Sequence, residues 1–243
     1  MDTEYNIVEN SHTTVVFVHG IVGSPYRFKD FFEYVPKDVS YIKVVLDGHG
    51  KKAKDFSHTS LKKWKSQIHS ILLPLKEKNQ RIIYVGHSMG CLLGILESIN
   101  DKTLIDTLFL LNVPLRAKVT FMTIKQCMKC AFGNPKNYDE MTHCFKDNCC
   151  IEISKNPFSY IGWPKRFIDL FRLMKETRKV ITNIKTPCIC FHSGKDELVQ
   201  QRTLKYLKKN PSLEIHVQKN AGHYYLNKED TKEVIDRFIS LFN

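Results

Sequence analysis

The stretch Arg81–Asn100, RIIYVGHSMGCLLGILESIN, gives the strongest indication of the fold of this chain. It begins with a short apolar run, Arg81 to Gly86, whose β-branched residues are typical of a buried strand. It continues through Gly86-His87-Ser88-Met89-Gly90, of the form Gly-x-Ser-x-Gly, into a helical pattern that ends near Ile99. In this strand-turn-helix setting such a turn thrusts a serine hydroxyl out over the edge of a sheet. Ser88 is therefore a candidate nucleophile.

Further apolar runs of the same kind recur along the chain. They are nearly continuous rather than alternating, which indicates strands buried on both faces of a parallel sheet. The predicted strands are Thr13–His19, Tyr41–Asp47, Arg81–Gly86, Thr107–Asn112, Pro187–Ser193 and Leu213–Gln218. The predicted core helices are Pro25–Val35, Leu61–Lys78, Met89–Ile99, Gln200–Lys209 and Glu229–Phe242. This alternation predicts an α/β fold, a doubly wound and mostly parallel sheet of about six strands.

One interval breaks the alternation. Between Asn112 and Thr186 the sequence shows no convincing strand, whereas an ordinary connection between a helix and a strand takes about 2–6 residues. We therefore predict that residues 113–183 form an inserted, mainly helical cap subdomain. Residues 1–112 and 184–243 then form the core domain.

A serine hydroxyl is a poor nucleophile without a base, and the base needs an acid that orients it. His223 follows the last predicted strand, and Asp196 follows the strand before it, with Glu197 as a competitor for the acid. Loops that follow parallel strands meet at the carboxyl edge of the sheet. The sequence therefore predicts that Ser88, Asp196 and His223 form a catalytic triad.

A tetrahedral intermediate also needs hydrogen-bond donors for its oxyanion. The backbone N–H of Met89, directly after the candidate nucleophile, is one candidate. The N–H of Ile21, in the turn His19-Gly20-Ile21-Val22-Gly23-Ser24, is the second. A plain strand-to-helix connection is the alternative for this turn. His19 itself is interpreted as a residue that braces the turn.

These motifs, together with Gly48-His49-Gly50, resemble the α/β-hydrolase superfamily. Within it the chain is similar to small bacterial carboxylesterases with a compact cap and, more distantly, to monoacylglycerol lipases. The resemblance runs from about Thr14 to Phe242 and is loosest across the predicted cap. The chain departs from larger members in one respect: because so few residues precede Thr13, we expect the antiparallel strands that usually open this fold to be missing. The roles of the site residues follow from the resemblance: nucleophile for Ser88, partners for Asp196 and His223, and oxyanion donors for Ile21 and Met89.

The expected function is that of a serine carboxylesterase, which hydrolyses short to medium acyl esters through an acyl-enzyme. The predicted lining of the acyl pocket is aromatic and comes from the cap: Phe158, Tyr160, Trp163, Phe167 and Phe171. Phe167, Leu170, Phe171 and Met174 recur at helical spacing, and this stripe either packs on the rest of the cap or roofs the pocket. A monoacylglycerol lipase, a thioesterase and an amidase are alternatives on the same fold. A non-catalytic ligand-binding protein is a more distant one.

The hydrophobic fraction and the distribution of charge bear on which partners the chain can bind. The chain has 243 residues, 42% of them hydrophobic, which excludes a disordered class, and a formal net charge of +12. Lys51–Lys65 and residues 113–183 together carry all of this net charge. We interpret these two basic segments as solvated faces, with weak contact with anionic surfaces or substrates as the alternative. No nucleic-acid-binding motif accompanies the charge, so no nucleic-acid partner is expected. The oligomeric state is not predicted.

The N-terminal residues are acidic and lack the basic and apolar regions of a signal peptide. We therefore expect a cytoplasmic protein without a transmembrane segment and with reduced thiols. Five cysteines with metal-like spacing fall within the predicted cap: Cys127, Cys130, Cys144, Cys149 and Cys150, with His143 beside them. No metal and no cofactor are expected, because the inferred mechanism needs neither.

Overall fold

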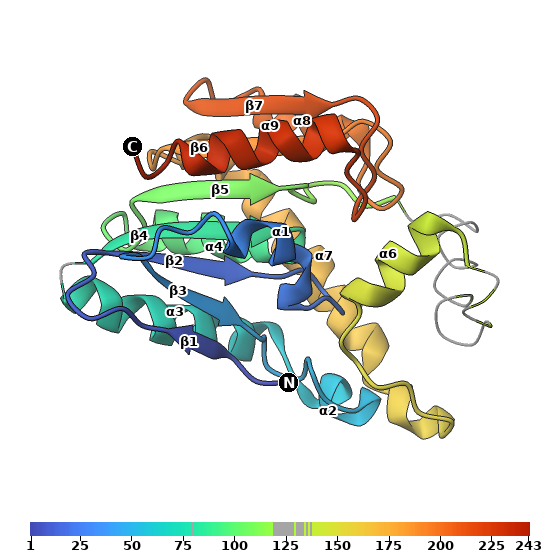
Figure 1. Cartoon of the computed structure of the whole chain (residues 1–243). Helices are drawn as coiled ribbons and strands as arrows, with labels where there is room; N and C mark the ends of the chain where they lie inside the picture. Colours follow the sequence, from blue (N-terminus) through green and yellow to red (C-terminus); the bar gives the residue numbers. More distant parts are fainter. Residues whose placement is uncertain (79, 119–128, 130–133, 135, 137) are drawn as a thin grey trace.

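Figure 1 shows the computed structural model, which describes residues 1–78, 80–118, 129, 134, 136 and 138–243. Within these residues, seven strands form one sheet in the order β1-β3-β2-β4-β5-β6-β7. Every neighbouring pair is parallel except β1 and β3. The strands are β1 (Glu4–Asn6), β2 (Thr13–Val18), β3 (Ser40–Val44), β4 (Arg81–His87), β5 (Thr107–Leu111), β6 (Cys188–Ser193) and β7 (Leu213–Gln218).

Helices cover both faces of this sheet, and α2 and α6 lie at the end toward which the parallel strands point (Figure 1). The α-helices are α1 (Lys29–Phe32), α2 (Ala53–His58), α3 (Leu61–Glu77), α4 (Met89–Asn100), α6 (Glu140–Asn148), α7 (Trp163–Val180), α8 (Leu204–Leu207) and α9 (Lys228–Ile239). The short 3₁₀ helices are η1 (Pro25–Phe28), η3 (Pro157–Tyr160), η4 (Ile181–Asn183) and η5 (Gln201–Thr203).

Two apolar clusters, one on each face, hold the sheet between its helices. Alternate residues of β2 serve both, since Val16 and Val18 pack toward α3, α4 and α7 while Val15 and Phe17 pack toward η1, α1 and α9. In the second cluster the ring of Phe17 lies 6.1 Å from that of Phe238. A strand buried on both faces needs apolar side chains at every position, which explains the continuous apolar runs in the sequence.

All six predicted strands are present, and the predicted fold class is confirmed. The sequence did not predict β1, and the expectation that no antiparallel strand opens the fold is wrong for this strand. Its three residues, Glu4–Asn6, are all exposed and pair only along one edge, with β3. So short a strand with no buried side chain leaves no periodic pattern to read.

The described part of the chain between β5 and β6 contains helices and no strand. Its longest helix, α7, buries Leu173 and Met174 in the cluster that also holds α3 and α4. Phe167 and Phe171 of the predicted stripe are instead 36% and 45% exposed. Leu170 and Met174 of the stripe do pack on this cluster, and Arg166 and Asp169 are buried on the same helix and pair with each other at 3.0 Å. The division into core and cap stays a prediction.

None of the described helices combines the length and the hydropathy that crossing a membrane requires.

Candidate functional site

Ser88 occupies a sharp turn between β4 and α4. Its φ of 52° and ψ of −119° lie outside the regions that side chains prefer, a strain of about 1–3 kcal/mol that folded proteins keep mainly at functional sites. Glycine is required on both sides of this turn, because a side chain at either position would clash with neighbouring atoms. A Cβ at Gly90 would lie 2.1 Å from the carbonyl oxygen of Val18, and one at Gly86 would lie 2.9 Å from Cys91 Cα. The turn therefore packs directly against its neighbours, and Ser88 is 7% exposed.

His223 and Asp196 form a buried pair in the loops after β7 and β6. His223 Nδ1 lies 2.8 Å from Asp196 Oδ2, and both side chains are at most 2% exposed. The other oxygen of Asp196 accepts hydrogen bonds from the backbone N–H groups of Leu198 and Val199, at 2.8 and 2.7 Å. Burial by itself would raise the pKa of Asp196, but His223 and these donors outweigh it and hold the pKa below its usual value. The carboxylate therefore stays charged beside the imidazole.

Glu197, the competitor for the acid, binds the backbone of the same histidine. Its Oε2 accepts a hydrogen bond from the N–H of His223 at 3.0 Å, while the ring of His223 binds Asp196. This arrangement favours Asp196 as the group that orients the imidazole.

Two residues that sequence reasoning did not assign fix His223 beside the serine turn. His87 Nε2 and Asn112 Nδ2 both donate to the carbonyl oxygen of His223, at 3.0 and 3.1 Å. Asn112 also accepts from Ser193 N–H at 2.8 Å and has a φ of 57°. Burial, and next the proximity of His223, hold the pKa of His87 well below its usual value. An asparagine directly after a buried strand was the available signal, because asparagine tolerates positive φ.

The turn that holds Ile21 lies against the nucleophile. A Cβ at Gly20 would lie 2.8 Å from Ser88 Cβ, so only glycine allows this approach. Met89 is the first residue of α4, where a backbone N–H has no earlier carbonyl of the helix to bind. Both predicted oxyanion donors thus come from backbone beside Ser88, and their role stays a prediction.

His19 braces this turn, as the sequence suggested. Its Nε2 accepts from Leu46 N–H at 3.1 Å, and its Nδ1 donates to Gly20 O at 2.7 Å. Burial lowers the pKa of His19 to about 4, so the ring is neutral at pH 7. With both ring nitrogens engaged by backbone, His19 is unsuited to be the base.

The five aromatic residues predicted to line an acyl pocket separate into two groups. Phe158, Phe167 and Phe171 are exposed, Phe158 by 75%. Tyr160 and Trp163 are partly buried, and Trp163 Nε1 donates to Ala53 O at 2.9 Å. Contact of any of these rings with a substrate stays a prediction.

The cysteines of the predicted cap are only partly described. Cys127 and Cys130 lie outside the described residues, Cys144 lies in α6, and Cys149 and Cys150 are free thiols. No cluster of three or more potential metal ligands is found among the described residues.

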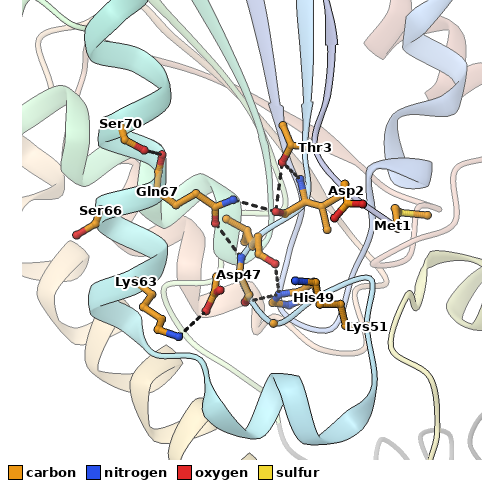
Figure 2. A pocket seen from close by; sticks show the side chains of 13 residues that line it. Met1, Asp2, Thr3, Asp47, His49, Lys51, Lys63, Ser66, Gln67 and Ser70 are labelled. Atoms are coloured by element: carbon orange, nitrogen blue, oxygen red, sulfur yellow. Dashed lines mark hydrogen bonds and ion pairs between the residues drawn. The ribbon is translucent and has the colours of Figure 1, made fainter.

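A cavity of about 580 Å³ lies between the N-terminal segment, the loop after β3 and α3, and Figure 2 shows its lining. Asp47, His49, Lys63 and Gln67 face it, and Ser88, Asp196 and His223 are not among its lining residues. The cavity is therefore separate from the candidate active site, although His49 connects the two regions through the turn that holds Ile21.

Comparison with known proteins identifies the family of this chain. A family model described as serine aminopeptidase, S33, matches residues 9–230. A thermostable monoacylglycerol lipase of Bacillus sp. (strain H-257) is 24% identical, over 96% of this chain and 92% of that protein.

Solved structures share the fold. The monoacylglycerol lipase of Paleococcus ferrophilus has a TM-score of 0.70 at 17% identity, over 99% of both chains. A soluble variant of the monoglyceride lipase of Saccharomyces cerevisiae has a TM-score of 0.70 at 14% identity, over 99% of this chain and 90% of the other. The family match covers most of the chain, so this protein is a serine hydrolase that belongs to the serine aminopeptidase S33 family of the α/β-hydrolase superfamily.

Proposed function

We propose that this protein is a carboxylic ester hydrolase in which Ser88, His223 and Asp196 form the catalytic triad. The observation that carries the proposal is the buried hydrogen bond between His223 Nδ1 and Asp196 Oδ2, 2.8 Å long, in loops anchored to the turn of Ser88. This bond places the imidazole proton on Nδ1, which leaves Nε2 free to accept a proton. A base poised in this way is what a serine nucleophile requires.

The proposed reaction proceeds in two steps. Ser88 Oγ bonds to the ester carbonyl carbon while His223 Nε2 takes its proton, and the N–H groups of Ile21 and Met89 bind the resulting oxyanion. The intermediate collapses to an acyl-enzyme, and the leaving alcohol takes the proton from His223. Water then attacks the acyl carbon, gives a proton to His223, and the proton passes to Ser88 as the acid leaves. Asp196 stabilises the imidazolium each time it forms.

The proposed substrates are esters with short to medium acyl chains, and residues 113–183 would cover the acyl group as a cap. The aromatic side chains Tyr160 and Trp163 of this segment support an apolar environment. Monoacylglycerol hydrolysis is the second candidate, since the relative that is 24% identical over 96% of this chain is a monoacylglycerol lipase.

A substrate panel tests both candidates. Purified wild type and Ser88→Ala would be assayed on p-nitrophenyl esters of increasing chain length, a 1-monoacylglycerol and an acyl thioester. We expect ester hydrolysis by the wild type and a loss of at least about 10⁴-fold in kcat for Ser88→Ala. A kcat/KM on the thioester above that on every oxygen ester would contradict the proposed ester preference. A Ser88→Ala variant with wild-type activity would contradict the proposed triad.

A further inference from the structure

The turn that holds Ile21 contains a strained residue that the proposed mechanism has not used. Val22 has a φ of 60°, in the left-handed region. This region disfavours residues with a Cβ, and a β-branched residue there is an outlier that its surroundings must hold in place. The peptide that links Ile21 to Val22 is part of this conformation. The N–H of Ile21 lies in the preceding peptide, Gly20–Ile21, so a bond that fixes Val22 restrains the proposed oxyanion donor through the backbone of Ile21.

His49 holds Val22 through a single hydrogen bond. The backbone N–H of Val22 donates to His49 Nε2 at 3.0 Å, and His49 Nδ1 lies 3.2 Å from Leu46 O and 3.3 Å from Asp47 O. Because carbonyl oxygens only accept, the ring proton is on Nδ1, and Nε2 presents a lone pair to Val22. Burial, and next the neighbouring His19, keep the pKa of His49 well below its usual value, which agrees with a neutral ring.

The ring of His49 is itself held rigidly. It is 1% exposed, and the rings of His19, Phe56 and Trp64 lie 4.8, 5.1 and 6.0 Å from it. Figure 2 shows how the loop that carries it is tied to α3, where Gln67 binds Asp47 N at 2.8 Å and Val45 O at 2.9 Å. A locked ring can impose its geometry on Val22 rather than follow it.

Cys150 holds the same turn from the segment predicted as the cap. Its Sγ lies 2.6 Å from Gly23 O, to which the thiol donates, and it accepts from Gly50 N–H at 3.2 Å. Burial raises the pKa of Cys150 to about 11, so the thiol keeps its proton. The backbone of Glu152 also binds that of Lys51 and Ala53, at 2.9 and 3.1 Å. Two residues after Cys150, the predicted cap is thus joined to the loop of His49.

We propose that His49 is a positioning residue for the oxyanion hole. Its lone pair holds Val22 in the left-handed conformation that aims the N–H of Ile21 at the reacting carbonyl, and Cys150 couples this turn to the predicted cap. The inference rests on the proposed function, in which Ile21 is an oxyanion donor. The strained Val22 conformation and the locked acceptor that faces it are the two observations that carry it.

Four variants test this role: His49→Ala, His49→Gln, the double variant His49→Ala/Val22→Gly, and the control His58→Ala, which removes an exposed histidine. For His49→Ala we expect a fall in kcat of about 10²-fold with KM changed by less than about threefold, the signature of a lost transition-state interaction. Glutamine can accept from Val22 through Oε1, so His49→Gln should recover at least about tenfold in kcat. Glycine adopts positive φ without the Cβ penalty, so the double variant should also recover at least about tenfold. His58→Ala should match the wild type.

The outcomes separate this inference from the proposed function. If Ser88→Ala abolishes activity while a folded His49→Ala keeps kcat within about threefold of wild type, the inference is wrong and the proposed function stands. Equal kcat values for His49→Ala and the double variant would also overturn it. If Ser88→Ala stays active, the proposed function itself fails.

Cys150 provides a test if His49→Ala does not fold. Cys150→Ser keeps a donor for Gly23 O and should retain kcat within about threefold, whereas Cys150→Ala should lose about tenfold. A wild-type kcat in Cys150→Ala would contradict the proposed role of Cys150 in coupling this turn to the predicted cap.

Discussion

Asparagine in place of Asp196 changes one atom of the buried pair that carries the proposed mechanism. Asp196 Oδ1 binds Leu198 and Val199 N–H at 2.8 and 2.7 Å, and an asparagine carbonyl oxygen can keep both bonds. Its NH₂ group then takes the place of Oδ2, 2.8 Å from His223 Nδ1. Because NH₂ is a donor, the ring must move its proton to Nε2, and Nε2 then cannot accept from Ser88.

We therefore expect Asp196→Asn to lower kcat by about 10⁴-fold, which corresponds to about 5 kcal/mol of lost transition-state stabilisation. The assay is the steady-state hydrolysis of a p-nitrophenyl ester by wild type and variant, with near-ultraviolet circular dichroism as the check on folding. Glu197→Gln is the matched control, since a glutamine oxygen can still accept from His223 N–H, and it should keep kcat within about threefold. An Asp196→Asn variant that retains more than about a tenth of the wild-type kcat would contradict the proposed role of Asp196. A larger loss in Glu197→Gln than in Asp196→Asn would move the acid role to Glu197.

Two further predictions concern stability. Gly90→Ala places a Cβ 2.1 Å from Val18 O and should lower the free energy of unfolding by about 3 kcal/mol in urea titrations. Gly222→Ala is a milder control, because its Cβ meets nothing closer than 3.2 Å. Equal stability of the two variants would contradict the close packing of the turn that holds Ser88. His19 has a pKa of about 4 in the fold against about 6.5 unfolded, so its contribution is complete above pH 6.5 and is lost as the pH falls toward 4. We expect the loss of this contribution to lower the free energy of unfolding by about 2–3 kcal/mol between pH 7 and pH 4.5. In urea titrations at the two pH values, His19→Gln, which cannot titrate, should show a correspondingly smaller drop. An identical pH dependence in wild type and His19→Gln would show that His19 is not the cause.

The sheet could be predicted from the sequence because its strands are buried on both faces. The runs that contain Val15–Val18 and Leu108–Leu111 are apolar at every position, and no solvated element requires this pattern. The three exposed residues of β1 carry no such constraint, and the strand depends on its edge pairing with β3. Local sequence therefore could not reveal it.

The candidate site also has a part that the sequence predicts and a part that it does not. Ser88, Asp196 and His223 each follow a recognisable strand, so their placement at the same edge of the sheet follows from topology. The bonds that Asn112 and His49 make could not be predicted in this way, because they run to the backbone of distant loops. Such contacts depend on loop geometry, which periodicity does not encode.

The buried face of α7 shows where pattern reading was insufficient. Phe167 and Phe171 fit a helical stripe yet are exposed, while Arg166 and Asp169, which neutralise each other, are buried beside Leu173 and Met174. A paired charge can occupy an inward position that a single charge would avoid. The i, i+3 spacing of Arg166 and Asp169 allows the pair to form, but the spacing does not show that the pair is buried.

Labelling by a fluorophosphonate shows directly whether Ser88 is an activated nucleophile. The probe would be added to folded wild type and to Ser88→Ala, and the covalent adduct would be counted by intact-protein mass spectrometry and located by peptide mapping. We predict one adduct per wild-type chain, on Ser88, and no adduct on the variant. A folded wild type that takes up no probe, or a variant that is labelled as fully as the wild type, would contradict the account.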